Sequence, residues 1–158
     1  MDSGGPKSLP LGSLTLCDIN VLVYAHRKDG HPDHAQFSAW LKRSVEGPQP
    51  FGLSEVVLAG FVRIVTNPAI FKDPTPIGKA LDFCQNLRLQ AGAVFVQPDH
   101  AHWKIFSDLC QQVGARGKLV ADAWFAALAI EHACTWISTD SDFARFPDLD
   151  WRHPLKAA

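Results

Sequence analysis

Short apolar segments alternate with longer segments of helical periodicity along this chain of 158 residues. The apolar segments that are typical of strands stand at residues 14–17, 93–96, 135–138 and, as an edge strand, 149–151. The helical patterns stand at residues 33–45, 54–66, 76–89, 99–113 and 119–132. Strands that alternate with helices predict an α/β fold, in which helices cover both faces of a mostly parallel sheet.

The length of the chain is that of one domain. Residues 1–13 are rich in Gly, Ser and Pro, so we expect a flexible tail there and the domain over residues 14–155. Lys and Arg number 15 and Asp and Glu number 16, which gives a net charge of −1. This balance excludes a protein that binds nucleic acid over its whole surface, but it leaves room for a local basic patch.

No apolar stretch is long enough to cross a bilayer, since the richest one covers only residues 56–62. The first 13 residues lack the apolar core of a signal peptide. The four cysteines form no C-x-x-C pair, and each stands in an apolar segment, which is typical of buried reduced thiols. We therefore expect a cytoplasmic protein with no membrane association.

Four carboxylates stand at element ends or inside apolar surroundings. Asp18 and Asp140 each follow directly after a predicted strand, and Glu55 begins an apolar helix. Asp122 lies inside an apolar run, where a charge without a partner is costly. Because ligands of parallel sheets bind beyond the carboxyl ends of the strands, the chemistry of the protein is expected at that edge.

Converging carboxylates repel one another, so they either raise one another's pKa values or bind a cation. Oxygen ligands of this kind suit Mg²⁺ or Mn²⁺, which activate water and neutralise phosphate charge. A structural interpretation stands beside this one. Asp140 and Asp142 fit a polar turn that caps a short helix, and Glu55 fits an ordinary first-turn acid. That interpretation is weakest for Asp122.

Four segments together resemble the acidic motifs of PIN-domain proteins. In chain order they are CDINVLVYA at residues 17–25, Ser54-Glu55, LVADAWFAALA at residues 119–129 and STDSDF at residues 138–143. The segments FVRIVTNP and DFARFPDLDW resemble the VapC toxin branch of that family, and the resemblance covers about residues 14–155. Each motif alone is weak, whereas four in order are specific.

The resemblance implies a three-layer α/β/α sandwich that is often dimeric, so a homodimer is expected. It also implies a Mg²⁺-dependent endoribonuclease, with Mn²⁺ as a possible substitute, that is the toxin of a bacterial toxin–antitoxin pair. A VapB-type antitoxin would hold it inactive, and RNA would be its substrate.

The resemblance also implies roles for individual residues. The acidic pocket would consist of Asp18, Glu55, Asp122 and Asp140. Asp18 and Asp122 would contact the metal directly, while Glu55 and Asp140 would orient metal-bound water. The expected supporting residues are Asn20, which would orient Asp18, Thr139, which would line the site, and Asp142, which would replace or assist Asp140. Ile19 and Trp124 depart from the family pattern, but no acidic position is lost.

RNA approaching an acidic pocket needs nearby cations. Arg27 and Lys28 follow the first motif, and Arg116 and Lys118 precede Asp122, so these four are candidate phosphate contacts. Ordinary solvated loop charges are the alternative interpretation. Arg63, on the same predicted helix as Glu55, would seat the antitoxin or orient an acid.

Two other classes of function compete with the nuclease. A PIN fold can act mainly as a scaffold in an antitoxin–DNA repressor complex, a role that is compatible with nuclease activity. A phosphoaspartyl or receiver-like enzyme also uses aspartates at strand ends. It requires a D-x-D motif after the first strand, where this chain has Asp18-Ile19-Asn20. The complete acid set favours the ribonuclease.

Overall fold

The computed structural model describes residues 14–156, and the tail predicted for residues 1–13 lies outside them. Five strands form one sheet in the order β3-β2-β1-β4-β5. Their bounds are β1 (Thr15–Cys17), β2 (Phe51–Leu53), β3 (Ala93–Phe95), β4 (Thr135–Ile137) and β5 (Trp151–Arg152). Every pair of neighbouring strands is parallel, so all five carboxyl ends share one edge.

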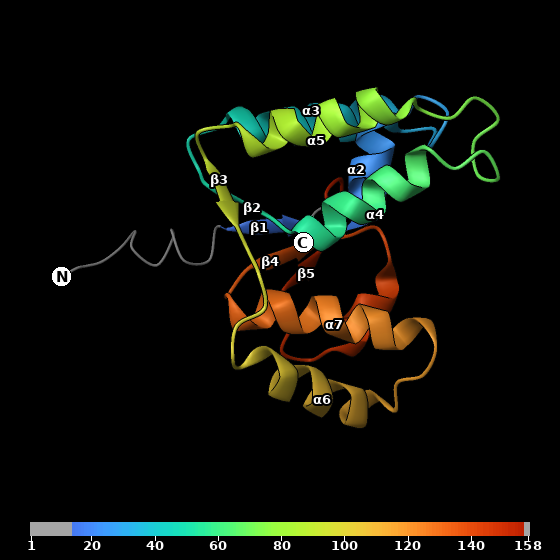
Figure 1. Ribbon diagram of the computed structural model, residues 1–158. Helices are drawn as coiled ribbons and strands as arrows, with labels where there is room; N and C mark the ends of the chain where they lie inside the picture. Colours follow the sequence, from blue (N-terminus) through green and yellow to red (C-terminus); the bar gives the residue numbers. More distant parts are fainter. Residues whose placement is uncertain (1–13, 157–158) are drawn as a thin grey trace.

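Helices cover both faces of this sheet, which confirms the predicted α/β/α sandwich (Figure 1). On one face lie α2 (Ile19–His26), α3 (His34–Glu46), α4 (Glu55–Val65) and α5 (Ile77–Arg88). On the other face lie α6 (His102–Val113) and α7 (Lys118–Glu131). A short 3₁₀ helix, η1 (Ser141–Arg145), follows β4. None of the helices in residues 14–156 has the length and apolar character that a membrane span requires.

Two elements were not predicted from the sequence, α2 and β2. The segment of α2 is rich in Val and Ile, which are typical of strands, but Asp18 caps it by accepting a hydrogen bond from the Ile19 N–H. Strand β2 is as short as β1, β3 and β4, but its sequence Phe-Gly-Leu contains a glycine, which is depleted in strands and interrupts the apolar run. Its Gly52 is required by close approach, because a Cβ there would lie 2.9 Å from the carbonyl oxygen of Thr15.

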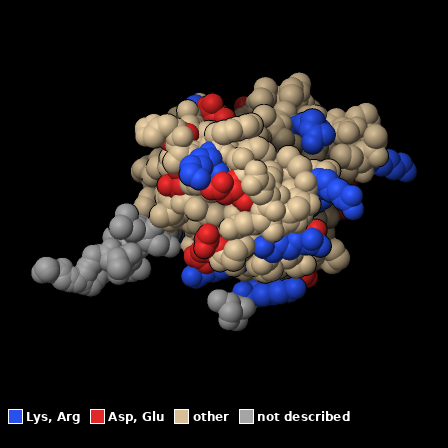
Figure 2. Space-filling view, turned by 90° about the horizontal axis from the view of Figure 1, so that it is seen from below, with Lys and Arg blue, Asp and Glu red and all other residues tan. Residues whose placement is uncertain are grey.

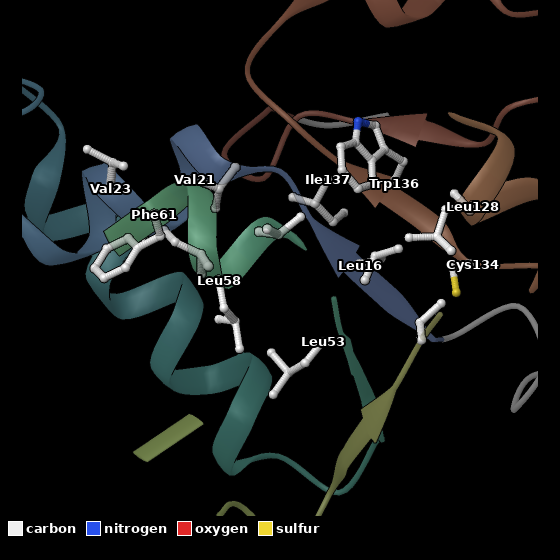
Figure 3. Close-up of a cluster of buried hydrophobic side chains, with 14 of the residues drawn as sticks. Leu16, Val21, Val23, Leu53, Leu58, Phe61, Leu128, Cys134, Trp136 and Ile137 are labelled. Carbon is white, nitrogen blue, oxygen red and sulfur yellow. The ribbon is translucent and has the colours of Figure 1, made fainter. Parts of the chain in front are cut away.

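The core lies between the sheet and the helices that carry the acidic motifs. Leu16 of β1 and Trp136 of β4 are fully buried, together with Phe61 of α4 and Leu128 of α7 (Figure 3). The side chains of α7 that face the sheet are mostly small, and four of its alanines are completely buried: Ala123, Ala126, Ala127 and Ala129. Small side chains let the helix axis approach the sheet closely, and this places Asp122 beside the carboxyl ends of β1 and β4.

Candidate active site

Asp18 is fixed in place by three hydrogen bonds at the end of β1. Its backbone N–H donates to the carbonyl of Ile137 at 2.8 Å. Its Oδ1 accepts from the Ile19 N–H at 2.7 Å, and its Oδ2 accepts from the Ser138 hydroxyl, also at 2.7 Å. Burial raises the pKa of Asp18, and the charges of Asp122 and Asp140 raise it further, although the two side-chain hydrogen bonds oppose this shift.

Asp122 and Asp140 meet at the ammonium group of Lys118. Lys118 lies one helical turn before Asp122, and its Nζ is 2.9 Å from Asp122 Oδ2 and 2.5 Å from Asp140 Oδ2. Asp140 caps η1, because its Oδ1 accepts from the N–H of Asp142 at 2.9 Å. Its own N–H donates to the Ser138 hydroxyl oxygen at 3.0 Å, so Ser138 contacts both Asp18 and Asp140.

The pKa values in this cluster move in different directions. Burial raises the pKa of Asp122, although Lys118 opposes the shift. Burial alone would raise the pKa of Asp140 as well, but its hydrogen bonds from Lys118 and from the Asp142 N–H outweigh it and lower that pKa. Burial would lower the pKa of Lys118, and its two carboxylate partners raise it instead. The site therefore stabilises a cation between two carboxylates.

Asp18, Asp122 and Asp140 line one cavity of about 660 Å³, together with Asn20 and Lys118. The Oδ1 atom of Asn20 is buried and accepts no hydrogen bond from any described residue. The hydrogen bonds that the Asp18 carboxylate accepts within residues 14–156 come from Ile19 and Ser138, and none comes from the Asn20 amide. The orienting role of Asn20 stays a prediction. Ser138 was not predicted as a site residue, since its only signal in the sequence is its position two residues before Asp140 in the fourth motif.

The structure does not bring Glu55 to the three aspartates. Glu55 is the first residue of α4, its side chain is 61% exposed, and its Oε2 pairs with Nη1 of Arg88 at 2.7 Å. It lines a separate hollow between α4 and α5, beside Asp82. The reason lies in the local geometry. Ser54 caps α4 with its side chain, and the next position, Glu55, turns toward α5 instead of the sheet edge.

The other predicted residues are distributed around the site. Asp142 is exposed, and its carboxylate lies in one group with those of Asp122 and Asp140, all with oxygens within 4.8 Å of one another. Thr139, which directly precedes Asp140, is half-buried. It is not one of the described residues that line the cavity.

Of the four predicted phosphate contacts, only Lys118 lines the cavity. Lys28 and Arg116 are exposed on loops. The side chain of Arg27 is only 12% exposed and is paired with Asp29. Arg63 of α4 lines the cavity, and its side chain is exposed.

Charges of both signs are interspersed on the face of the molecule that carries α6. Figure 2 shows this face, and among its described residues no broad area of one charge is visible. This agrees with the net charge of −1. On this face the described residues therefore offer no broad positive surface to a polyanion.

Comparison with known protein families matches residues 15–149 to the PIN domain. The chain belongs to the PIN-domain family. It is 45% identical over 141 residues to VapC ribonuclease Mb2897 of Mycobacterium bovis, which covers 89% of this chain and 95% of that protein. It is 38% identical over 134 residues to ribonuclease VapC25 of Mycobacterium tuberculosis, with 85% and 94% of the two chains covered. These relatives confirm the resemblance found in the motifs.

Solved structures of PIN-domain relatives share the fold. The structure of VapBC2 from Rickettsia felis bound to a DNA fragment from their promoter gives a TM-score of 0.65 at 19% identity, with 89% of this chain and 98% of that chain covered. FitAB bound to the IR36 DNA fragment gives a TM-score of 0.61 at 18% identity, with 92% and 98% covered. At these identities the likeness establishes the arrangement of the sheet and its helices.

The residues present fit a divalent cation of the kind that PIN-domain nucleases use. The donors at the site are all oxygens, which hard cations prefer, and three carboxylates converge there. The buried Oδ1 of Asn20 is a further oxygen without a partner among the described residues. An ammonium group already bridges two of the carboxylates, which shows that the site favours positive charge.

Proposed function

We propose that this protein is a Mg²⁺-dependent endoribonuclease, the toxin of a VapBC-type toxin–antitoxin module. The observation that carries the proposal is the convergence of Asp18, Asp122 and Asp140 in one cavity of a PIN domain. Curated relatives at up to 45% identity are named ribonucleases, and this supports RNA as the substrate. RNA cleavage in the cytoplasm is the activity that fits both the aspartate cavity and the names of the relatives.

In the proposed mechanism Asp122, Asp140 and Asp142, whose carboxylate oxygens lie within 4.8 Å of one another, would hold the cation. Asp18, which the family resemblance implies as a direct ligand, lines the same cavity beside them. Mg²⁺ or Mn²⁺, when bound, neutralises phosphate charge and supplies an activated water. Ser138 fixes Asp18 and the backbone of Asp140 at the same time, so the cluster is preorganised before RNA enters. Lys118 is placed to donate to a phosphate oxygen of the RNA, which would take the place of the Asp140 carboxylate as acceptor.

The proposal includes a VapB-type antitoxin as partner and a homodimer as the assembled form. The solved structures of VapBC2 and FitAB, which share the fold, are each bound to a DNA fragment, and this favours a second role as a scaffold in a repressor complex. The two roles are compatible, because an antitoxin that blocks the cavity can also bind its promoter. RNA cleavage discriminates between a nuclease and a scaffold alone.

The test is cleavage of a labelled mixed RNA by the purified protein, in EDTA and with Mg²⁺ or Mn²⁺ restored. We expect cleavage only with the metal, and none by an Asp122→Asn variant prepared in the same way, which controls for contaminating nucleases. Sequencing of the cleaved ends then defines the RNA target. Full cleavage by Asp122→Asn would show that this cluster is not the active site.

A further inference from the structure

The cavity that holds Asp18, Asp122 and Asp140 is also lined by residues from the end of α4 and from the loop that follows it. Arg63 and Ile64 belong to α4, and Ile70 and Phe71 belong to the loop of residues 66–76. Ile70 is 52% exposed, although it is a large apolar residue. This part of the lining contributes no carboxylate, and it lies outside the acidic motifs.

Arg27 holds that loop in place. Its Cζ lies 4.2 Å from the centre of the Phe71 ring, and its Nη1 donates to the Thr75 hydroxyl at 3.1 Å. Its Nε and Nη2 donate to the two carboxylate oxygens of Asp29 at 2.8 and 2.7 Å. His26 Nε2 lies 3.2 Å from the same Thr75 hydroxyl. All three nitrogens of the Arg27 guanidinium are thus engaged within the protein.

Thr75 itself is buried and anchors the far end of the loop, since its N–H donates to the carbonyl of Val65 at 2.8 Å. The near end of the loop is closed by Asn67, whose carbonyl accepts from the N–H groups of Ile70 and Phe71. The loop is therefore tied to α2 and α4, and Arg27, the C-cap residue of α2, joins it to Asp29, which lines the cavity.

Arg63 differs from the other charged groups of the cavity lining. Asp29 is paired with Arg27, and Lys118 is paired with both Asp122 and Asp140. Arg63 is exposed and makes no ion pair with any of residues 14–156. It is the cation of the lining that is free to bind an incoming anion.

We propose that Arg63 contacts a backbone phosphate of the RNA and that Arg27 is a positioning residue that holds the 66–76 loop beside it. This inference rests on the proposed ribonuclease function. A guanidinium binds phosphate in a bidentate manner and keeps its charge beside carboxylates. Ile70 adds an apolar surface for a base or ribose, which suits unpaired nucleotides that are splayed apart.

The first experiment measures binding of a short fluorescein-labelled single-stranded RNA of mixed sequence by anisotropy. All proteins carry Asp122→Asn, so that the RNA is bound and not cut. Titrations run from about 50 to about 200 mM KCl, because each phosphate contact on a single strand contributes about 0.7 to the slope of log Kd against log salt. We expect Arg63→Gln to weaken binding roughly tenfold and to reduce the slope by about 0.7.

Arg43→Gln is the matched control. Arg43 is also an exposed helix arginine, but it lies beside Thr15, at the amino end of β1, on the opposite edge of the sheet. We expect the Arg43→Gln protein to keep the parent affinity and slope. Equal losses for the two variants would overturn the role of Arg63, because they would reflect nonspecific charge.

The second experiment separates positioning by Arg27 from direct contact. Arg27→Lys keeps the charge but loses the stacking on Phe71 and the forked contact with Asp29. We expect weaker RNA binding with an unchanged salt slope, and Phe71→Leu, which leaves every cation in place, should give the same result. A slope that falls for Arg27→Lys as it does for Arg63→Gln would make Arg27 itself the phosphate contact. Unchanged binding in both variants would overturn the positioning role.

Failure of this inference is distinguishable from failure of the proposed function. If the wild type does not cleave RNA with Mg²⁺, the ribonuclease proposal fails. If it cleaves and Arg63→Gln binds RNA like its parent, only the present inference fails. Loss of antitoxin binding by Arg63→Gln with RNA binding intact would assign the residue to the antitoxin instead.

Discussion

Two neighbouring strands are each followed by an acidic residue, and the two acids have different surroundings. Asp18 comes directly after β1, is half-buried, and shares a cavity with Asp122 and Asp140. Glu55 comes two residues after β2, is 61% exposed, and pairs with Arg88 across a separate hollow. An acid at the end of a parallel strand is therefore not enough to make a site, since its position in the following helix turn decides where it points.

The two regions also differ in how their charge is compensated. Glu55 and Arg88 form an ordinary exposed pair, which contributes little to stability. In the aspartate cluster a single ammonium, on Lys118, serves both Asp122 and Asp140, and no cation of residues 14–156 forms an ion pair with Asp18. Excess negative charge with partial burial is what a divalent cation relieves.

The largest expected effect is on RNA cleavage. Asp122→Asn should lower the rate by at least about 10²-fold, because it removes a charge from the cation site while keeping the shape of the side chain. Glu55→Gln should leave the rate within about twofold, because it changes only an exposed pair away from the cavity. Single-turnover cleavage of one labelled RNA by the two variants measures both effects.

A loss of activity in Glu55→Gln as large as that in Asp122→Asn would break this comparison. It would mean that α4 turns Glu55 into the cluster when RNA is bound, which is the four-carboxylate pocket that the sequence predicts.

A smaller effect is expected on thermal stability without metal. Lys118→Met leaves Asp122 and Asp140 without their shared cation, so the melting temperature in EDTA should fall by about 2–4 °C. Millimolar Mg²⁺ should then raise the melting temperature more in Lys118→Met than in the wild type, because the ion no longer competes with the ammonium. Differential scanning fluorimetry measures both shifts, with Glu55→Gln as the control variant.

The same melting temperature with and without Mg²⁺ in Lys118→Met would argue that the cluster binds no divalent ion.

The smallest effect concerns pH. The pKa of Asp18 is raised above its ordinary value of 3.8, so the folded protein holds a proton that the unfolded chain has already lost. Its contribution to stability therefore falls as pH rises from 3.8 through the raised pKa. Asp18→Asn removes the destabilisation that the ionised Asp18 carboxylate causes. In EDTA at pH near 7 the variant should therefore raise the melting temperature by about 2 °C.

Melting curves of the wild type and Asp18→Asn over a pH series check the sign. The advantage of the variant should shrink toward acid and vanish below 3.8, where the carboxyl is protonated in both states. An advantage that grows toward acid would contradict the raised pKa.

Much of the fold was predictable, and the exceptions have local causes. Alternating patterns predicted the parallel sheet, but β2 carries a glycine in its middle and α2 is rich in β-branched residues, so neither element shows its own pattern. Among the site residues, Asp122 was the strongest prediction, because a charge inside an apolar run is costly unless it has a partner. Its convergence with Asp18 and Asp140 is seen in the structure, whereas Glu55 does not join them.

Contacts between distant segments were beyond the sequence. The hydroxyl of Ser138 reaches Asp18 across 120 positions of the chain, and Arg27 stacks on Phe71 and binds Thr75 across the loop. The sequence predicted Arg27 as a phosphate contact because it marks only that a cation lies near the first motif. The partner of a cation depends on the packing of other elements.

The sequence by itself determined the layered architecture and the family, because periodicity and motif order are local properties of the chain. The tertiary structure decided which acids share a cavity and which cations are already engaged. Both depend on the rotation of each helix about its axis and on the register of the parallel strands. The physical reason is that such contacts arise from close packing between segments far apart in the sequence, where one helical position turns a side chain by about 100°.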